Sequence, residues 1–173
     1  VRALKMHGGL AKTELGAENL PALEKGIPNL LRHVSNIKNV YKLPSVVAVN
    51  RFPTDTDAEI EFIIEKCKEL GVNVVLSTVW AEGGKGGEEL AKEVVALCEQ
   101  PNDFTFSYEL DCTIEEKIEA VVKKVYGGDG VVLTPNAKKQ AQKLTEMGFG
   151  NCPVCMAKTQ YSFSDDPTKL GAP

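Results

Sequence analysis

Two short apolar runs, each followed by a loop and a helical segment, constrain the fold of this chain more than any other feature of its sequence. Residues 45–49 read Ser-Val-Val-Ala-Val and residues 72–76 read Val-Asn-Val-Val-Leu. Short runs rich in β-branched residues predict strands that are covered on both faces, as in parallel sheets. Two strand–loop–helix units in succession therefore predict an α/β fold with parallel strands joined by right-handed crossovers.

The expected helices follow from apolar spacing and from capping signals. Apolar residues recur at helical intervals from Leu20 to Val34, and Pro28 within that run predicts a helix that is kinked or begins in two pieces. A second helix is expected to reach about Leu70, and a third to cover residues 88–100. Each of these last two follows one of the predicted strands, as a strand–helix repeat requires.

The character of the sequence changes after Pro101, and a domain boundary is expected near residues 100–103. Residues 1–102 are predicted to form a parallel-sheet portion organised like P-loop nucleotide-binding proteins, and residues 103–173 a smaller α/β domain. In the smaller domain, strands are expected at residues 104–108 and 154–157, and helices at residues 113–126 and 135–147.

Composition argues against two classes of protein. The formal net charge is −4, whereas nucleic-acid binding depends on basic surface that neutralises phosphates. No apolar run approaches the roughly 20 residues that a membrane helix requires. With 43% hydrophobic and 25% charged residues, the chain has the composition of an ordinary soluble domain.

Five cysteines, an odd number, do not form the pattern of a secreted disulfide framework, and they predict reduced thiols in a cytoplasmic protein. Cys152 and Cys155 have the spacing of zinc sites and redox pairs. Zinc would need two further ligands, and the chain offers no second pair of this kind and only His7 and His33. We therefore expect no metal site.

The loops after the two predicted strands are the expected place of function, because ligands of parallel sheets bind outside the carboxyl ends of the strands. In the first loop, Asn50 carries an amide that can read a purine edge or can serve only the turn. Phe52 is either partly exposed or packed on the following helix. The second loop holds Trp80, the only tryptophan. The two rings could face one crevice and hold a flat heteroaromatic ligand, with separate packing in the core as the alternative.

Residues 81–87 contain four glycines, which allow a ligand to approach the backbone closely just before a helix N-terminus. The segment is not a Walker A loop, because the four-residue spacer and the Gly-Lys-[Ser/Thr] ending are missing. By itself it gives little support for a phosphate site.

Four long stretches of the sequence resemble formate–tetrahydrofolate ligases, and they occur in the order found in that family. They are Val1–Gly9, Val49–Glu59, Trp80–Gly87 and Met156–Asp166. The similarity extends over essentially the whole chain. Lys158, Gln160 and Tyr161 match the family too, but no physical argument gives them a role.

The resemblance implies that 10-formyltetrahydrofolate is made from formate, ATP and tetrahydrofolate through formyl phosphate, with Mg²⁺ screening the phosphates. It implies that the pterin ring is held between an aromatic of the first loop and the tryptophan of the second, here Phe52 and Trp80. Asn50, Ala81 and Gly83 are the expected contacts on the nucleotide side. A homo-oligomer is also implied for the full-length enzyme.

The resemblance further implies that the family's phosphate-binding loop, and the basic residues that grip formyl phosphate, belong upstream of Val1. Because the chain does not begin with Met, we expect it to be part of a longer protein and its catalytic residues to lie in that upstream segment. We therefore expect this chain to carry folate contacts without ligating formate alone. The alternatives are a non-catalytic folate-binding or subunit-assembly module and an unrelated nucleotide-binding α/β ligase.

Overall fold

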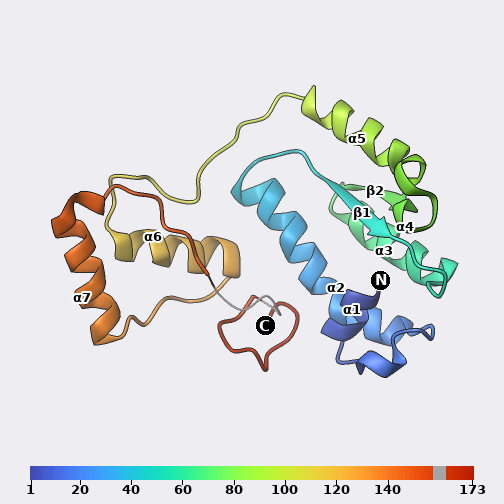
Figure 1. Cartoon of the computed structure of the whole chain (residues 1–173), viewed down its shortest axis with the longest axis horizontal. Coiled ribbons are helices and arrows are strands. Elements are labelled where there is room, and N and C mark those ends of the chain that lie inside the picture. The colour runs from blue at the N-terminus through green and yellow to red at the C-terminus, as the bar shows by residue number, and fades with distance from the viewer. Residues whose placement is uncertain (158–162) are drawn as a thin grey trace.

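The computed structural model describes residues 1–157 and 163–173, so Lys158, Gln160 and Tyr161 lie outside the described residues. Figure 1 shows a mostly helical chain with one small sheet. The α-helices are α1 (Arg2–His7), α2 (Leu20–Ser35), α3 (Asp57–Glu69), α4 (Val79–Glu82), α5 (Glu88–Cys98), α6 (Ile114–Val121) and α7 (Pro135–Leu144). Short 3₁₀ turns form η1 (Lys12–Glu14) and η3 (Gly83–Gly87), and π-type turns form η2 (Asn36–Val40), η4 (Val122–Tyr126) and η5 (Thr145–Phe149).

The sheet consists of β1 (Val46–Asn50) and β2 (Asn73–Ser77), which run parallel in a register that places Asn50 opposite Ser77. The predicted α/β class and the parallel pairing of these two strands are therefore confirmed. The prediction that both faces of the first strand are covered is wrong for this chain. Burial alternates along the strand: Val47 and Val49 are buried, and Ala48 and Asn50 are exposed.

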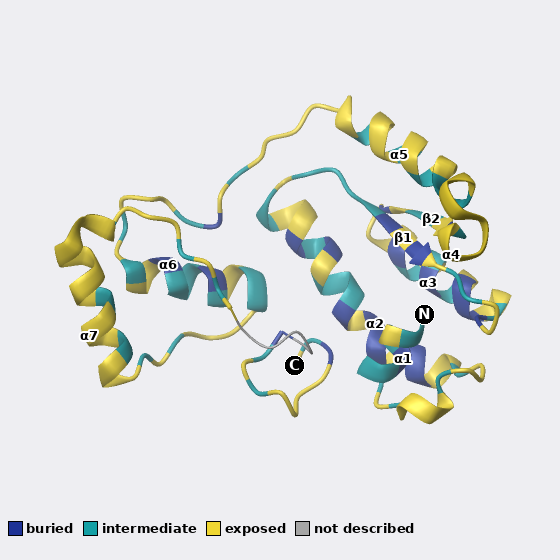
Figure 2. Cartoon of the chain, in the orientation of Figure 1, coloured by how far each residue is buried: buried dark blue, intermediate teal, exposed yellow. Residues whose placement is uncertain are grey.

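One hydrophobic core lies between the buried face of β1 and the helices α2 and α3. The darkest ribbon segments in Figure 2 mark this region. The buried residues of the core are Leu23, Ile27, Val34, Val47, Val49, Ile63, Cys67 and Val72. This core thus anchors the carboxyl end of β1 through Val49, and β2 is held in place by its pairing with β1.

The helices agree with the sequence more closely than the strands do. Pro28 lies inside α2, which runs without a break from Leu20 to Ser35, so the alternative of two separate helix pieces is wrong. Thr113 caps α6 through a reciprocal capping box with Glu116, as predicted.

The strands predicted at residues 104–108 and 154–157 do not form. The hydroxyl of Tyr108 accepts a hydrogen bond from the Val154 amide at 2.9 Å and donates to the Val154 carbonyl at 3.1 Å. The Thr105 amide donates to the carbonyl of Tyr41. Because these backbone groups find partners in a side chain and in the end of η2, they need no strand ladder.

Residues 99–113 contain no helix or strand and connect α5 to α6, which lies with α7 to one side of α2 (Figure 1). Side chains of α2 and η2 contact this later part of the chain. Asn36 donates to the carbonyl of Val125 at 2.9 Å, and Asn29 donates to that of Gly171 at 3.1 Å. The boundary near residues 100–103 stays a prediction.

Among the described helices, none is both long enough and apolar enough to cross a bilayer.

The short helix α1 crosses α2 at a distance that only glycine permits. A Cβ atom built on Gly26 would lie 1.8 Å from the Leu4 carbonyl oxygen, and one built on Gly8 would lie 1.9 Å from the Ala22 carbonyl oxygen. Both contacts are with backbone, which cannot turn away as a side chain can. The two glycines therefore fix α1 against α2.

Gly26→Ala is expected to destabilise the chain by about 1–3 kcal/mol, because an overpacked contact outweighs the gain in helix propensity. The free energy of unfolding would be measured in urea. Gly16→Ala is the control, since nothing lies within 4 Å of a Cβ atom at that position. Equal stabilities for the two variants would contradict the tight crossing.

Candidate ligand-binding site at the strand ends

Phe52 and Trp80 lie in contact beyond the carboxyl ends of β1 and β2. Their ring centroids are 5.9 Å apart and their planes are inclined by 52°. Trp80 is 64% exposed, and Phe52 is half-buried. The structure therefore brings together the two rings that the sequence placed after successive parallel strands, and it leaves them open to solvent. Their binding role stays a prediction.

The loop that carries Phe52 is fixed by the carboxylate of Asp55, which is almost wholly buried. Its Oδ2 accepts a hydrogen bond from the Phe52 amide at 2.9 Å, and the Asp55 amide donates to the Phe52 carbonyl at the same distance. These reciprocal bonds close a tight turn around Pro53 and Thr54. Among the described residues, Oδ1 of Asp55 has no hydrogen-bond partner.

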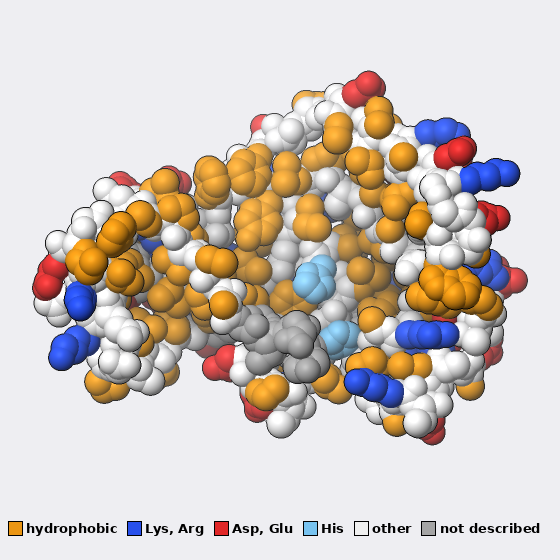
Figure 3. All heavy atoms as spheres, viewed as in Figure 1, with side chains coloured by type: hydrophobic (Ala, Val, Ile, Leu, Met, Phe, Trp, Pro, Cys, Tyr) orange, Lys and Arg blue, Asp and Glu red, His pale blue; other side chains and the backbone are white. Residues whose placement is uncertain are grey.

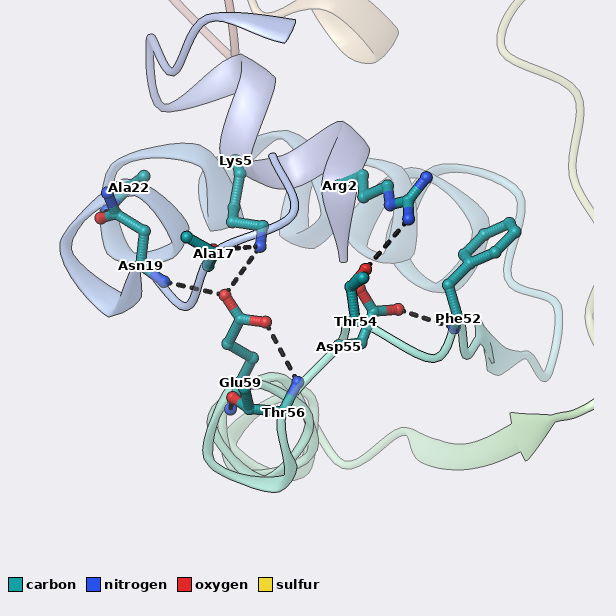
Figure 4. Close-up of polar contacts among 10 residues, drawn as sticks. All are labelled: Arg2, Lys5, Ala17, Asn19, Ala22, Phe52, Thr54, Asp55, Thr56 and Glu59. Atoms are coloured by element: carbon teal, nitrogen blue, oxygen red, sulfur yellow. Dashed lines mark hydrogen bonds and ion pairs between the residues drawn. The ribbon is translucent and has the colours of Figure 1, made fainter. Parts of the chain in front are cut away.

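Arg2 of α1 reaches the same loop. The central carbon of its guanidinium lies 4.8 Å from the centroid of the Phe52 ring, which is a cation–π contact. Its Nη2 donates to Oγ1 of Thr54 at 2.9 Å. Figure 4 shows Arg2 entering from α1 beside Thr54 and Phe52.

The other end of the loop is held by a buried ion pair between Lys5 and Glu59. The two charged atoms are 2.9 Å apart, and neither side chain is exposed to solvent. Nζ of Lys5 also donates to the Ala17 carbonyl, and the Glu59 carboxylate accepts from the amides of Asn19 and Thr56. One carboxylate thus joins α1, the start of α2 and the start of α3, as the dashed lines in Figure 4 show.

The pKa of Glu59 lies below the ordinary glutamate value even though the group is buried. Burial raises the pKa, but the hydrogen bond and charge of Lys5 and the amides of Asn19 and Thr56 lower it by more. The buried group is therefore a carboxylate at neutral pH. Its charge is part of the folded structure.

The glycine-rich segment after β2 is not an open loop but folds into α4 and η3. Gly83 has φ 61° and ψ −145°, a conformation restricted essentially to glycine. A Cβ atom on Gly86 would lie 2.5 Å from the carbonyl carbon of Thr78, and the Thr78 amide donates to the Gly86 carbonyl. These two glycines therefore let the segment turn back on the end of β2 and present Trp80.

The candidate nucleotide contacts occupy the same edge of the sheet. Asn50 is the exposed last residue of β1, and Ala81 and Gly83 are exposed in α4 and at the start of η3. The conformation of Gly83 has a local structural cause, so a ligand is not needed to explain that glycine. The role of all three in nucleotide binding stays a prediction.

Cys152 and Cys155 are both exposed, in a segment held by Lys117. This buried lysine donates to the carbonyls of Gly150 and Cys152. Within residues 1–157 and 163–173, no group of three or more His, Cys, Asp and Glu side chains is arranged to hold a metal ion.

The residues that hold the site in place were not found from the sequence. Arg2 and Lys5 are three residues apart and therefore lie on the same side of α1. Their spacing was visible, but their partners Thr54 and Glu59 lie more than fifty residues further along the chain. Only the Thr56–Glu59 capping spacing gave a local signal, and it does not reveal the lysine.

A parallel pair of strands with two aromatic rings in contact beyond its carboxyl end defines an α/β chain with a candidate site at that edge of the sheet. The sequence profile of the family described as Formate–tetrahydrofolate ligase matches residues 1–173. The chain belongs to the formate–tetrahydrofolate ligase family.

Glu59→Gln is expected to lower the free energy of unfolding by about 3–5 kcal/mol, because it leaves the Lys5 ammonium buried without a counter-charge. Denaturant unfolding measures the effect, and Glu61→Gln on the exposed side of α3 is the control. The double variant Lys5→Met, Glu59→Gln should regain part of the loss. Equal free energies of unfolding for Glu59→Gln and Glu61→Gln would show that the ion pair does not stabilise the fold.

The stability that Glu59 contributes should depend on pH. A folded-state pKa below the unfolded value of about 4.3 means that this stability is fully present above that value and is lost as the pH falls through the folded pKa. Unfolding curves of the unsubstituted chain and of Glu59→Gln should therefore converge in acid. A difference in the free energy of unfolding between these two chains that stays constant from pH 7 to pH 2 would contradict the predicted pH dependence.

Proposed function

We propose that this chain supplies the folate-binding edge of a formate–tetrahydrofolate ligase, with the pterin ring held between Phe52 and Trp80. The family match supports a ligase that uses formate and tetrahydrofolate with ATP. The observation that carries the proposal is the contact of the two rings at the strand ends, with Trp80 largely exposed. Two separate core aromatics would not have this arrangement.

In the proposal, binding separates the two rings. A flat guest between them needs about 7 Å between ring planes, twice a van der Waals contact of about 3.5 Å, and nearly parallel rings. The observed 5.9 Å and 52° are too close and too tilted for that. Because Phe52 is held by Asp55 and Arg2 while Trp80 lies on a short exposed turn, Trp80 is the ring that moves.

The nucleotide is proposed to bind beside the pterin, with Asn50 presenting its amide to the base and the backbone at Ala81 and Gly83 lining the same edge. Their exposure at the ends of neighbouring strands supports this assignment. The 173 residues contain no Walker A motif. We assign neither the ATP phosphates nor Mg²⁺ to residues of this chain.

The chemistry proposed for the whole enzyme begins with transfer of the terminal phosphoryl group of ATP to formate. Phosphorylation gives formate a leaving group, so the folate nitrogen can attack the formyl carbon and release phosphate. The role proposed for this chain is to hold the pterin so that this nitrogen faces the formyl group. Without a phosphate-binding loop, the chain alone is proposed not to ligate formate.

A second proposed role is subunit assembly. Figure 3 shows hydrophobic side chains over much of one face of the chain. Exposed apolar residues occur in several elements and include Val95 of α5, Phe106 and Val132 in connecting segments, and Met147 of η5. Apolar surface of this kind suits contact with a second chain. This observation supports the predicted homo-oligomer and does not compete with folate binding.

Tetrahydrofolate is expected to quench the fluorescence of Trp80, the only tryptophan, because the pterin stacks on its indole. Phe52→Ala should weaken binding about threefold to tenfold, the value of one aromatic stacking contact. Phe104→Ala, which removes an exposed aromatic ring outside the site, is the control. Binding that is insensitive to Phe52→Ala would contradict the stacked pterin.

The unsubstituted 173-residue chain, incubated with ATP, formate and tetrahydrofolate, is expected not to form 10-formyltetrahydrofolate. The product would be measured by its absorbance after acidification. Turnover by this chain alone would contradict the proposed division between folate binding and phosphate chemistry.

A further inference from the structure

The Phe52 ring is held by a cation as well as by its backbone. Arg2 lies over the ring at 4.8 Å and is itself anchored to Thr54 through a hydrogen bond of 2.9 Å. Its Nε is buried and has no hydrogen-bond partner among the described residues. Hydrogen bonding alone therefore does not account for the position of this guanidinium, and the aromatic face is part of what it packs against.

The helix that carries Arg2 is rigidly placed. Gly8 and Gly26 hold α1 in backbone contact with α2, and Lys5 fixes α1 to Glu59 at the start of α3. From a single short helix, Arg2 thus contacts the loop between β1 and α3 at Thr54, and Lys5 contacts Glu59 in the first turn of α3 (Figure 4). Movement of the loop and the first turn of α3 relative to α1 would break both contacts.

The two cations differ in what they hold. Lys5 is fully buried in an ion pair that joins three helices, so its loss affects folding. Arg2 is only half-buried, and it contacts the ring and the Thr54 hydroxyl at the surface. Removal of its side chain should free the ring and leave the core unchanged.

We propose that Arg2 is a positioning residue of the folate site: its guanidinium, anchored to Thr54, covers one face of Phe52 and fixes the ring so that the other face receives the pterin. A ring fixed before binding loses less rotational freedom when the ligand stacks on it, which favours affinity. The binding of the pterin in this inference rests on the proposed function. The fixation of the Phe52 ring by Arg2 is independent of it.

The experiment compares Arg2→Met with Lys12→Met, which removes the same charge at an exposed position outside the site. Both are made in the 173-residue chain labelled with 4-fluorophenylalanine, and the ¹⁹F signal of Phe52 is identified by its loss in Phe52→Leu. Arg2→Met should shift or broaden this signal, and Lys12→Met should leave it unchanged. The midpoints of thermal unfolding of the two variants should agree.

Titration with tetrahydrofolate, followed by Trp80 fluorescence, gives the second measurement. Arg2→Met should raise the Kd about threefold to tenfold, because binding must then order a ring that Arg2 no longer fixes in advance. Arg2→Lys keeps the charge but not the flat guanidinium, and it should restore part of the affinity. Thr54→Val, which removes the anchor alone, should raise the Kd in the same direction and serves if Arg2→Met does not fold.

The outcomes separate the two proposals. An unchanged Phe52 signal in Arg2→Met overturns the positioning role, whether or not the chain binds folate. A changed signal with an unchanged Kd also overturns it. If the unsubstituted chain does not bind tetrahydrofolate while the signal still responds to Arg2→Met, the folate function fails and the fixation of the ring by Arg2 stands.

Discussion

The buried pair of Lys5 and Glu59 is the interaction on which the arrangement of the site depends. Two charges without solvent exposure are costly unless their remaining hydrogen-bonding groups find partners. Here the carboxylate accepts from Lys5, Asn19 and Thr56, and the ammonium also donates to Ala17. Because these partners belong to three helices and one loop, the pair fixes the relative positions of all of them.

That rigidity contrasts with the exposed side of the site. Phe52 is held through its backbone by Asp55 and through its ring by Arg2, whereas Trp80 stands on the short helix α4, which is followed by the glycine-rich turn η3. In the proposed function, the fixed ring of Phe52 and a movable ring of Trp80 let the site open for a flat ligand and close on it. The exposed indole of Trp80 supports the proposal that a ligand covers this surface.

The sequence predicted those parts of the fold that depend on local patterns. The two parallel strands, the Thr113–Glu116 capping box and the closeness of Phe52 to Trp80 all follow from short-range signals and from the rule that loops after parallel strands share one edge. The Lys5–Glu59 pair could not be found in this way, because its partners are separated by 54 positions and nothing local requires them to meet. The predicted strand at residues 104–108 failed for a related reason. The Thr105 amide donates to the Tyr41 carbonyl and the Tyr108 hydroxyl bonds to the backbone of Val154, and the alternation of aromatic residues cannot reveal these partners.

A crystal structure of the chain with tetrahydrofolate tests the proposed folate site most directly. We expect the pterin between Phe52 and Trp80, with the ring centroids moved from 5.9 Å to about 7 Å apart, and the contacts of Arg2 and Lys5 unchanged. A pterin bound elsewhere while the two rings remain in contact would contradict the proposed site.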